Sequence, residues 1–323
     1  MIKSFYINSK FNKFNFKTIN FLSWIFFVGI LCFLVYDNFN PETKKNDNIN
    51  SFVENFSIEF FDVGKADSAL VRFGHHAVLI DAAEKNSATS VKDKLNQRGI
   101  KKFDFVVLTH PHSDHYGQMP EILKKFIIKY LVTAKSGINS HEKSNFKKII
   151  RKFKKMKIPI KFVKSGDIIK IDNVVFKILG PSKKYTNINN NSVVMQILYK
   201  NHSFLLTGDM EKAAEKDLLN LYSGESLKSN IIKIAHHGSS TSSTEAFLSK
   251  VNPKIAIISS GKYFNSAALY PSTKTLSTLE KLKIKTYITE KVGSIIASVI
   301  DDKIIIKTEK NDVSQNQDIE KAA

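Results

Sequence analysis

The segment from Val106 to Gly117 reads V-V-L-T-H-P-H-S-D-H-Y-G and holds three of the nine histidines of the chain. The apolar run at 103–108 predicts a buried strand before it, and residues 117–126 have helical spacing after it. Imidazole nitrogen and carboxylate oxygen are ligand types that suit zinc or manganese. The segment therefore predicts a metal-binding loop between a strand and a helix. The alternative is a solvated loop whose histidines hold no ion.

Two further predicted strands end on residues of the same chemical kind. Thr207-Gly208-Asp209 follows one of these strands, and Ala235-His236-His237 follows the other. Ligands at the ends of different strands converge on one edge of a layered fold. The metal ligands that we expect at this edge are His110, His112, Asp114, His115, Asp209, His236 and His237.

Such a set can hold two divalent ions, zinc or manganese, with Asp209 shared between them because a carboxylate can bridge. Ions that lie close together lower the pKa of a bound water and stabilise charge on the attacked centre. The predicted activity is therefore hydrolysis without a nucleophilic side chain, and Asp114 is the candidate catalytic base. Another possible role for Asp209 is the N-cap of a helix beginning at Met210.

The order of the predicted elements is β-rich with interspersed helices, in two runs that each begin with paired strands. This order favours an α/β fold with two sheets packed face to face and helices outside, an αββα sandwich, although strand count alone would also fit other layered α/β folds. We expect the folded domain to span residues 56–308 and a polar tail to span 309–323. The single cysteine, Cys32, excludes an internal disulfide and a multi-cysteine metal site.

The N-terminal part of the chain predicts a membrane anchor. Residues 1–18 are polar and basic, 19–36 are almost continuously apolar, and 37–55 have the composition of a flexible linker. The apolar run is just long enough for a single transmembrane helix, and the preceding lysines orient its N-terminus toward the cytoplasm. The domain would then be extracellular on a single-pass membrane protein. The alternative is a cleaved signal peptide and a secreted domain.

The chain is strongly basic, with a net charge of +19. Residues 140–157 predict an amphipathic helix whose polar face is dense in lysine. Such a surface can contact the phosphate backbone of a nucleic acid or anionic lipid. The other interpretations are a solvated helix face and the lysine-rich composition of an A+T-rich genome.

The run His110-Pro-His112-Ser-Asp114-His115 resembles the H-x-H-x-D-H signature of the metallo-β-lactamase superfamily. The sequence at 61–68, F-D-V-G-K-A-D-S, resembles the opening of the extracellular hydrolase domain of ComEC-type DNA-uptake proteins. The blocks V-L-I-D (78–81), N-S-V-V (191–194), L-T-G-D (206–209) and H-H-G-S (236–239) follow in the order of that branch. The resemblance covers the chain from about Phe56 to Lys307 and implies the metallo-β-lactamase fold.

The resemblance also implies a ligand set. His110, His112 and Asp209 would serve one metal, Asp114, His115 and Asp209 the other, and one of His236 and His237 would add to the shell. The third histidine of the first site is missing, because residues 189–192 stand in its place, a substitution common in this branch. Lys65-Ala66 replaces the usual Gln-Gly, and Tyr270-Pro271 the usual His-Pro. The candidate substrate-binding residues are Asn191, Ser239, Tyr270 and Lys65.

Three functions remain open from the sequence. The first is a membrane-anchored phosphodiesterase or nuclease acting on extracellular DNA in a ComEC-like role. The second is a hydrolase of another ester, such as a phosphorylcholine-type ester, a cyclic nucleotide, a lactone or a β-lactam. The third is a non-catalytic metal-binding module, which the complete H-x-H-x-D-H run disfavours.

Overall fold

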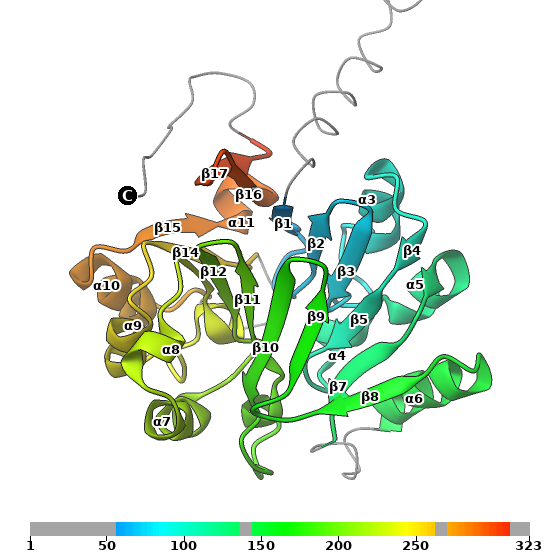
Figure 1. Cartoon of the computed structure of the whole chain (residues 1–323), viewed down its shortest axis with the longest axis horizontal. Coiled ribbons are helices and arrows are strands. Elements are labelled where there is room, and N and C mark those ends of the chain that lie inside the picture. Colours follow the sequence, from blue (N-terminus) through cyan, green and yellow to red (C-terminus); the bar gives the residue numbers. More distant parts are fainter. Residues whose placement is uncertain (1–55, 136–143, 262–269, 311–323) are drawn as a thin grey trace, which may run out of the picture. The chain divides into compact units, whose positions relative to one another are not determined.

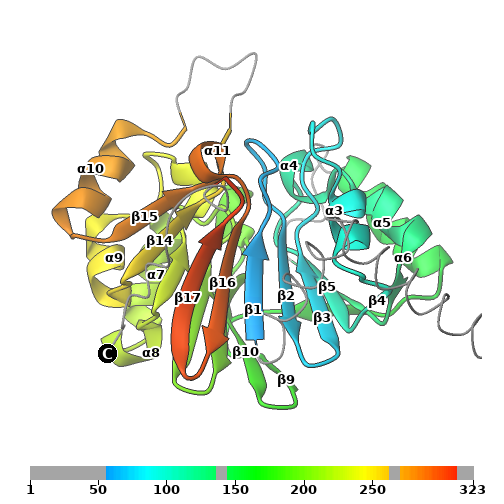
Figure 2. The same cartoon turned by 90° about the horizontal axis from the view of Figure 1, so that it is seen from above.

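The computed structural model describes residues 56–135, 144–261 and 270–310, and their fold is a four-layered α/β sandwich. Two sheets face each other, and helices cover the outer face of each (Figures 1 and 2). This arrangement confirms the predicted αββα fold. The predicted anchor at 19–36 lies outside the described residues. Within the described ranges, no helix is long and apolar enough to cross a membrane.

The first sheet joins the beginning and the end of the described chain. Its strand order is β17-β16-β1-β2-β3-β5-β7-β8. β1 pairs antiparallel with both β16 and β2, whereas β3, β5, β7 and β8 are parallel to one another. The strands are β1 (Phe56–Phe60), β2 (Ala69–Phe73), β3 (His76–Ile80), β5 (Phe105–Leu108), β7 (Leu131–Ala134), β8 (Ile160–Val163), β16 (Ile295–Ile300) and β17 (Lys303–Thr308).

The second sheet has the order β15-β14-β13-β12-β11-β10-β9. Here the strands from β12 to β15 are parallel, and those from β9 to β12 are antiparallel. The strands are β9 (Ile168–Ile171), β10 (Val174–Gly180), β11 (Val194–Tyr199), β12 (His202–Leu206), β13 (Ile231–Lys233), β14 (Ile255–Ile258) and β15 (Lys285–Ile288). A separate pair of short strands, β4 (Lys102–Phe103) and β6 (Ile127–Ile128), lies beside the first sheet.

Side chains of successive residues on the central strands point to opposite faces of their sheet, and this explains the layers. Phe105 and Val107 of β5 face the core between the sheets, whereas Val106 and Leu108 face the outer helices. On β12, Phe204 faces the same inter-sheet core. Burial on both faces accounts for the continuous apolar character of these strands, as expected of parallel strands covered by helices.

The outer helices bury apolar faces on the two sheets. α3 (Val91–Gln97), α5 (Met119–Lys125) and α6 (Ser144–Lys155) cover the first sheet. α7 (Lys212–Leu221), α9 (Glu245–Val251) and α10 (Thr273–Lys281) cover the second. Five shorter helical segments complete the described chain: α4 (Ser113–Tyr116), α8 (Gly224–Leu227), α11 (Thr289–Val292) and the 3₁₀ segments Asn189–Asn191 and Ala235–Gly238.

Several predicted boundaries are corrected. The expected strand at 103–108 is split at Asp104, whose carboxylate accepts bonds from the Ala77 amide and from His76. The helix expected over 117–126 is α5, which starts at Met119, and the short α4 precedes it. Folded contacts also continue beyond Thr308, because Glu309 bonds to Lys94 and to the Ser294 amide.

Candidate metal centre

The metal loop is held to the first sheet by Asp81. Because β3 and β5 are parallel, Asp81 at the end of β3 meets Thr109 at the end of β5. Asp81 accepts bonds from the Thr109 amide at 2.8 Å and from the Thr109 hydroxyl at 2.7 Å. Its Oδ2 also lies 2.7 Å from His115 Nδ1. Asp81 thus fixes the first residue of the loop and orients one of its histidines.

Two histidine rings of the loop point their nitrogens at a common position. His110 Nε2 lies 3.0 Å from His112 Nδ1 and 3.6 Å from Asp209 Oδ2. The other ring nitrogen of His110 is 3.2 Å from the Thr109 hydroxyl oxygen. The hydroxyl hydrogen already goes to Asp81, so this oxygen accepts from His110 Nδ1–H. His110 Nε2 is then left with a lone pair for an ion.

Asp209 enters from the second sheet, beyond the end of β12. Its amide donates to the Ser192 hydroxyl at 3.1 Å. Gly208 permits the close approach, because its φ is +51° and a Cβ there would lie 2.9 Å from the Ser192 Cβ. The N-cap role considered for Asp209 is wrong, since α7 begins only at Lys212, with Glu211 at its N-cap. Its buried carboxylate faces the metal loop instead.

His236 and His237 follow β13 in a tight 3₁₀ turn, η4 (Ala235–Gly238), with φ of 52° and 53°. The turn sends the two rings in different directions. His237 is fully buried, its Nδ1 donates to the Ser259 carbonyl at 3.1 Å, and its Nε2 is 3.3 Å from Asp114 Oδ2. The His236 side chain is 19% exposed and pairs with Glu211 at 3.3 Å. His237 is therefore the inner member of the pair.

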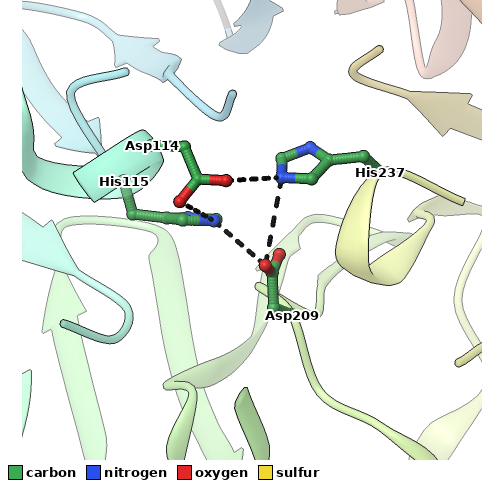
Figure 3. Close-up of side chains that lie close together, drawn as sticks. All are labelled: Asp114, His115, Asp209 and His237. Atoms are coloured by element: carbon green, nitrogen blue, oxygen red, sulfur yellow. Dashed lines mark hydrogen bonds and ion pairs between the residues drawn. The ribbon is translucent and has the colours of Figure 1, made fainter. Parts of the chain in front are cut away.

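Side chains from both sheets converge in two groups with ligand atoms within 4.8 Å of one another. One group is Asp114, His115, Asp209 and His237 (Figure 3), and the other is His110, His112 and Asp209. Among the described residues, the buried atoms His115 Nε2 and Asp209 Oδ1 have no hydrogen-bond partner. Buried polar atoms are normally satisfied, so these atoms fit ligation of a divalent ion.

The electrostatics fit the same interpretation. Burial by itself lowers the pKa of His115, but the carboxylates of Asp209, Asp81 and Asp114 outweigh it and raise that pKa well above its usual value. Burial raises the pKa of Asp209, but His115, His237 and His110 outweigh it and hold that pKa well below its usual range. An ion that binds here takes the place of protons on the imidazoles.

The candidate substrate residues have different environments. Asn191 is buried and spends its side chain on the backbone of Tyr185 and of Asn187, so it shapes its own loop. The Ser239 hydroxyl bonds within the turn to Thr241. Substrate contact by Asn191 and by Ser239 stays a prediction.

Lys65 and Tyr270 lie together near His236. The Lys65 ammonium is 4.3 Å from the centre of the Tyr270 ring, and that ring is 6.1 Å from the His236 ring. Both side chains are only partly buried. They remain candidates for substrate contact.

Sequence reasoning missed the residues that support the ligands. Asp81 and Thr109 carry no metal-binding pattern, although parallel strand ends that share an edge are a signal that could have found them. Asp67, in the loop between β1 and β2, and Lys233, at the end of β13, form a buried ion pair at 2.9 Å. No local pattern joins these two positions.

Comparison with known proteins agrees with the fold. The family model described as the metallo-beta-lactamase superfamily matches residues 61–262. ComE operon protein 3 of Bacillus subtilis is 32% identical over 257 residues, which are 74% of this chain and 32% of that protein. Competence protein ComA of Neisseria gonorrhoeae is 28% identical over 241 residues, with the same shares of each chain. The chain thus spans about a third of the length of these ComEC-type competence proteins.

A solved structure shows the same fold. Igni18, described as a novel metallo hydrolase from Ignicoccus hospitalis, is matched with a TM-score of 0.52 at 14% identity. The match covers 74% of this chain and 98% of that chain.

Proposed function

Since the chain belongs to the metallo-β-lactamase superfamily, we propose that it is a metal-dependent hydrolase that cleaves phosphodiester bonds of DNA. The observation that carries the hydrolase proposal is the pair of ligand groups that share Asp209. Their nitrogen and carboxylate atoms come from both sheets, so only the folded domain assembles them. One or two divalent ions are the cofactor, with zinc and manganese as the candidates.

The ligands divide between two positions. His110 and His112 would hold one ion and Asp114, His115 and His237 the other, with Asp209 contributing to both. When bound, these ions lower the pKa of a water molecule and stabilise negative charge on the attacked centre. Asp81 and Thr109 keep the histidine rings oriented. Asp114, whose side chain is 24% exposed, would accept the proton of the attacking water.

The choice of DNA rests on charge and on relatives. α6 presents Lys148, Arg151, Lys152, Lys154 and Lys155 to solvent. Its buried Phe146 packs edge-on against Tyr116 of α4, with ring centres 5.3 Å apart, so the basic helix adjoins the metal loop. The two relatives described above are named ComE operon protein 3 and competence protein ComA. A phosphate backbone is the polyanion that fits such a surface.

A hydrolysis screen tests the substrate proposal. The purified chain, loaded with manganese or zinc, would be assayed on single- and double-stranded DNA, bis-p-nitrophenyl phosphate and a lactone. Cleavage of DNA and of bis-p-nitrophenyl phosphate, without hydrolysis of the lactone, is the expected result. Lactone hydrolysis without phosphodiester cleavage would move the activity to the other esters that this fold accommodates, since fold alone does not determine substrate.

For the location of the domain, we propose that residues 19–36 anchor it to the cell membrane and that it faces outward. The lysines that precede this apolar run support the orientation. Protease added to intact cells should cleave the domain. In cells without protease, the domain should be found in the membrane fraction. Protection from protease on intact cells, or release into the medium, would contradict the proposal.

A further inference from the structure

A third group of potential ligands lies behind the metal loop and consists of Asp67, Asp81 and His115. This group has a cation of the chain within bonding distance. The Lys233 ammonium is 2.9 Å from Asp67 Oδ2. It also donates to the carbonyl oxygen of Ile234 at 2.9 Å. The third group therefore needs no metal ion to balance Asp67.

Lys233 is unusually placed for a lysine. It is the last residue of β13, it lies on the same side of that strand as Ile231 of the inter-sheet core, and only 4% of it is exposed. Its partner Asp67 is 7% exposed and lies in a loop of the first sheet. The pair therefore connects the two sheets inside the sandwich. Lysines are almost never buried unless they are paired, so the ion pair with Asp67 accounts for the burial of Lys233.

The second oxygen of Asp67 faces a metal-ligand candidate. Asp67 Oδ1 is 3.6 Å from His237 Nδ1, and among the described residues it has no hydrogen-bond partner. His237 Nδ1 is also 3.1 Å from the Ser259 carbonyl oxygen. A carbonyl and a carboxylate on the same side of the ring both favour a proton on Nδ1. The lone pair then lies on Nε2, which faces Asp114 and Asp209.

We propose that Lys233 is a resident cation that fixes Asp67 behind His237, and that Asp67 is a positioning residue that keeps Nε2 of His237 available to a metal ion. Residues behind metal ligands set the tautomer and the orientation of an imidazole in this way. The inference rests on the proposed metal site but not on the identity of the substrate. It assigns a role in metal binding to two residues that are not themselves ligands.

A purely structural role is the competing explanation. Buried ion pairs contribute little to stability compared with apolar residues of similar size, whereas removing one partner is strongly destabilising. The combination of Asp67→Asn with Lys233→Met should therefore restore most of the stability that Lys233→Met alone loses. If the pair served only to join the sheets, the double variant would also recover wild-type metal binding.

The experiment measures manganese affinity by calorimetry, the cobalt absorption spectrum and the thermal midpoint for the full chain and its variants. We expect Lys233→Met to lower both the midpoint and the affinity. The double variant should regain the midpoint yet bind manganese about 10- to 100-fold more weakly than wild type, with an altered cobalt spectrum. The conservative Asp67→Asn variant alone should show the same loss of affinity. It tests the role of Asp67 even if a Lys233 variant does not fold.

The matched control is the ion pair between the buried Glu59 and the partly buried Arg98, in which Arg98 Nη2 lies 2.6 Å from Glu59 Oε1. Neither residue belongs to any of the three ligand groups. Replacing the pair by Gln and Met should change the midpoint and leave manganese affinity unchanged. Wild-type affinity in the Asp67→Asn variant or in the double variant would overturn the inference. Failure of the wild-type chain to bind any divalent ion would instead overturn the proposed function.

Discussion

Asp81 shows how much of the candidate site depends on residues that are not ligands. Its two oxygens bond the backbone and the hydroxyl of Thr109 and the ring of His115. The Thr109 hydroxyl in turn accepts from His110. One carboxylate and one hydroxyl therefore orient one histidine in each of the two ligand groups.

The Thr109→Val variant tests this support. Valine keeps the shape of the side chain but leaves His110 Nδ1 without its acceptor and Asp81 Oδ2 with one bond fewer. We expect metal affinity to fall by about 10- to 100-fold, as is typical of residues that orient ligands. Calorimetric titration with manganese would measure it. Thr133→Val is the matched control, because within the described ranges the buried hydroxyl of Thr133, on β7, bonds only the Leu108 carbonyl oxygen. Equal affinities for the two variants would contradict the role of Thr109.

Most of the candidate ligands could be predicted because they follow strands in short, chemically distinctive runs. The inner position of His237 could not, since the choice between it and His236 depends on two left-handed backbone conformations in succession. Lys233 could not be predicted either, because a lone lysine in an apolar strand resembles an edge residue until its partner across the sandwich is known. Pairs between distant loops leave no local pattern.

At the scale of elements, α6 is the clearest match between pattern and structure. Phe146, Ile149, Ile150 and Phe153 are buried. The basic side chains between them are exposed, apart from the half-buried Lys147. The split at Asp104 and the late start of α7 were not predictable in this way. They depend on side-chain bonds to other elements, such as those of Asn190, which accepts from the amides of Glu211 and Ala214.

The exposed face of α6 is tested by replacing Lys148, Lys152 and Lys155 with Gln. If this face contacts phosphates, the slope of log affinity for DNA against log salt should shrink by about 2 to 3, at roughly 0.7–0.9 per contact. The turnover number should stay unchanged, because none of the three belongs to the ligand groups. Fluorescence anisotropy over a salt series measures the slope.

The control carries the same change of net charge on the opposite outer layer, with Lys216, Lys250 and Lys281 replaced by Gln. These exposed lysines lie on α7, α9 and α10. If the control reduces the slope as much as the α6 variant does, binding follows net charge alone and the surface has no specific role.

At the scale of the whole molecule, the end of the described chain is tied back to its first helix. Partial burial raises the pKa of Glu309, but the bonds from Lys94 and from the Ser294 amide outweigh it and hold that pKa at about 2. A carboxyl whose pKa is lowered on folding adds stability above its unfolded value and loses it as pH falls through the folded value. The window here runs from about pH 4.5 down to about pH 2.

The Glu309→Gln variant should therefore be less stable than wild type at neutral pH. The side chain is about half exposed, so solvent screening limits the difference to at most about 1 kcal/mol. The difference should diminish as the pH is lowered through this window. Urea unfolding at several pH values measures it, and a difference that grows on acidification would contradict the assignment.

The central claim is that the two ligand groups sharing Asp209 make this domain a metal-dependent hydrolase. Its most direct test is the manganese-dependent hydrolysis of bis-p-nitrophenyl phosphate by wild type and by Asp209→Asn, with bound metal measured in both. We expect wild type to bind one or two ions and to hydrolyse the ester. Asp209→Asn should lose bound metal and more than about 100-fold of the activity, beyond the range of residues that only orient ligands. Hydrolysis by Asp209→Asn at the wild-type rate, or a wild-type protein that binds no divalent ion, would contradict the claim.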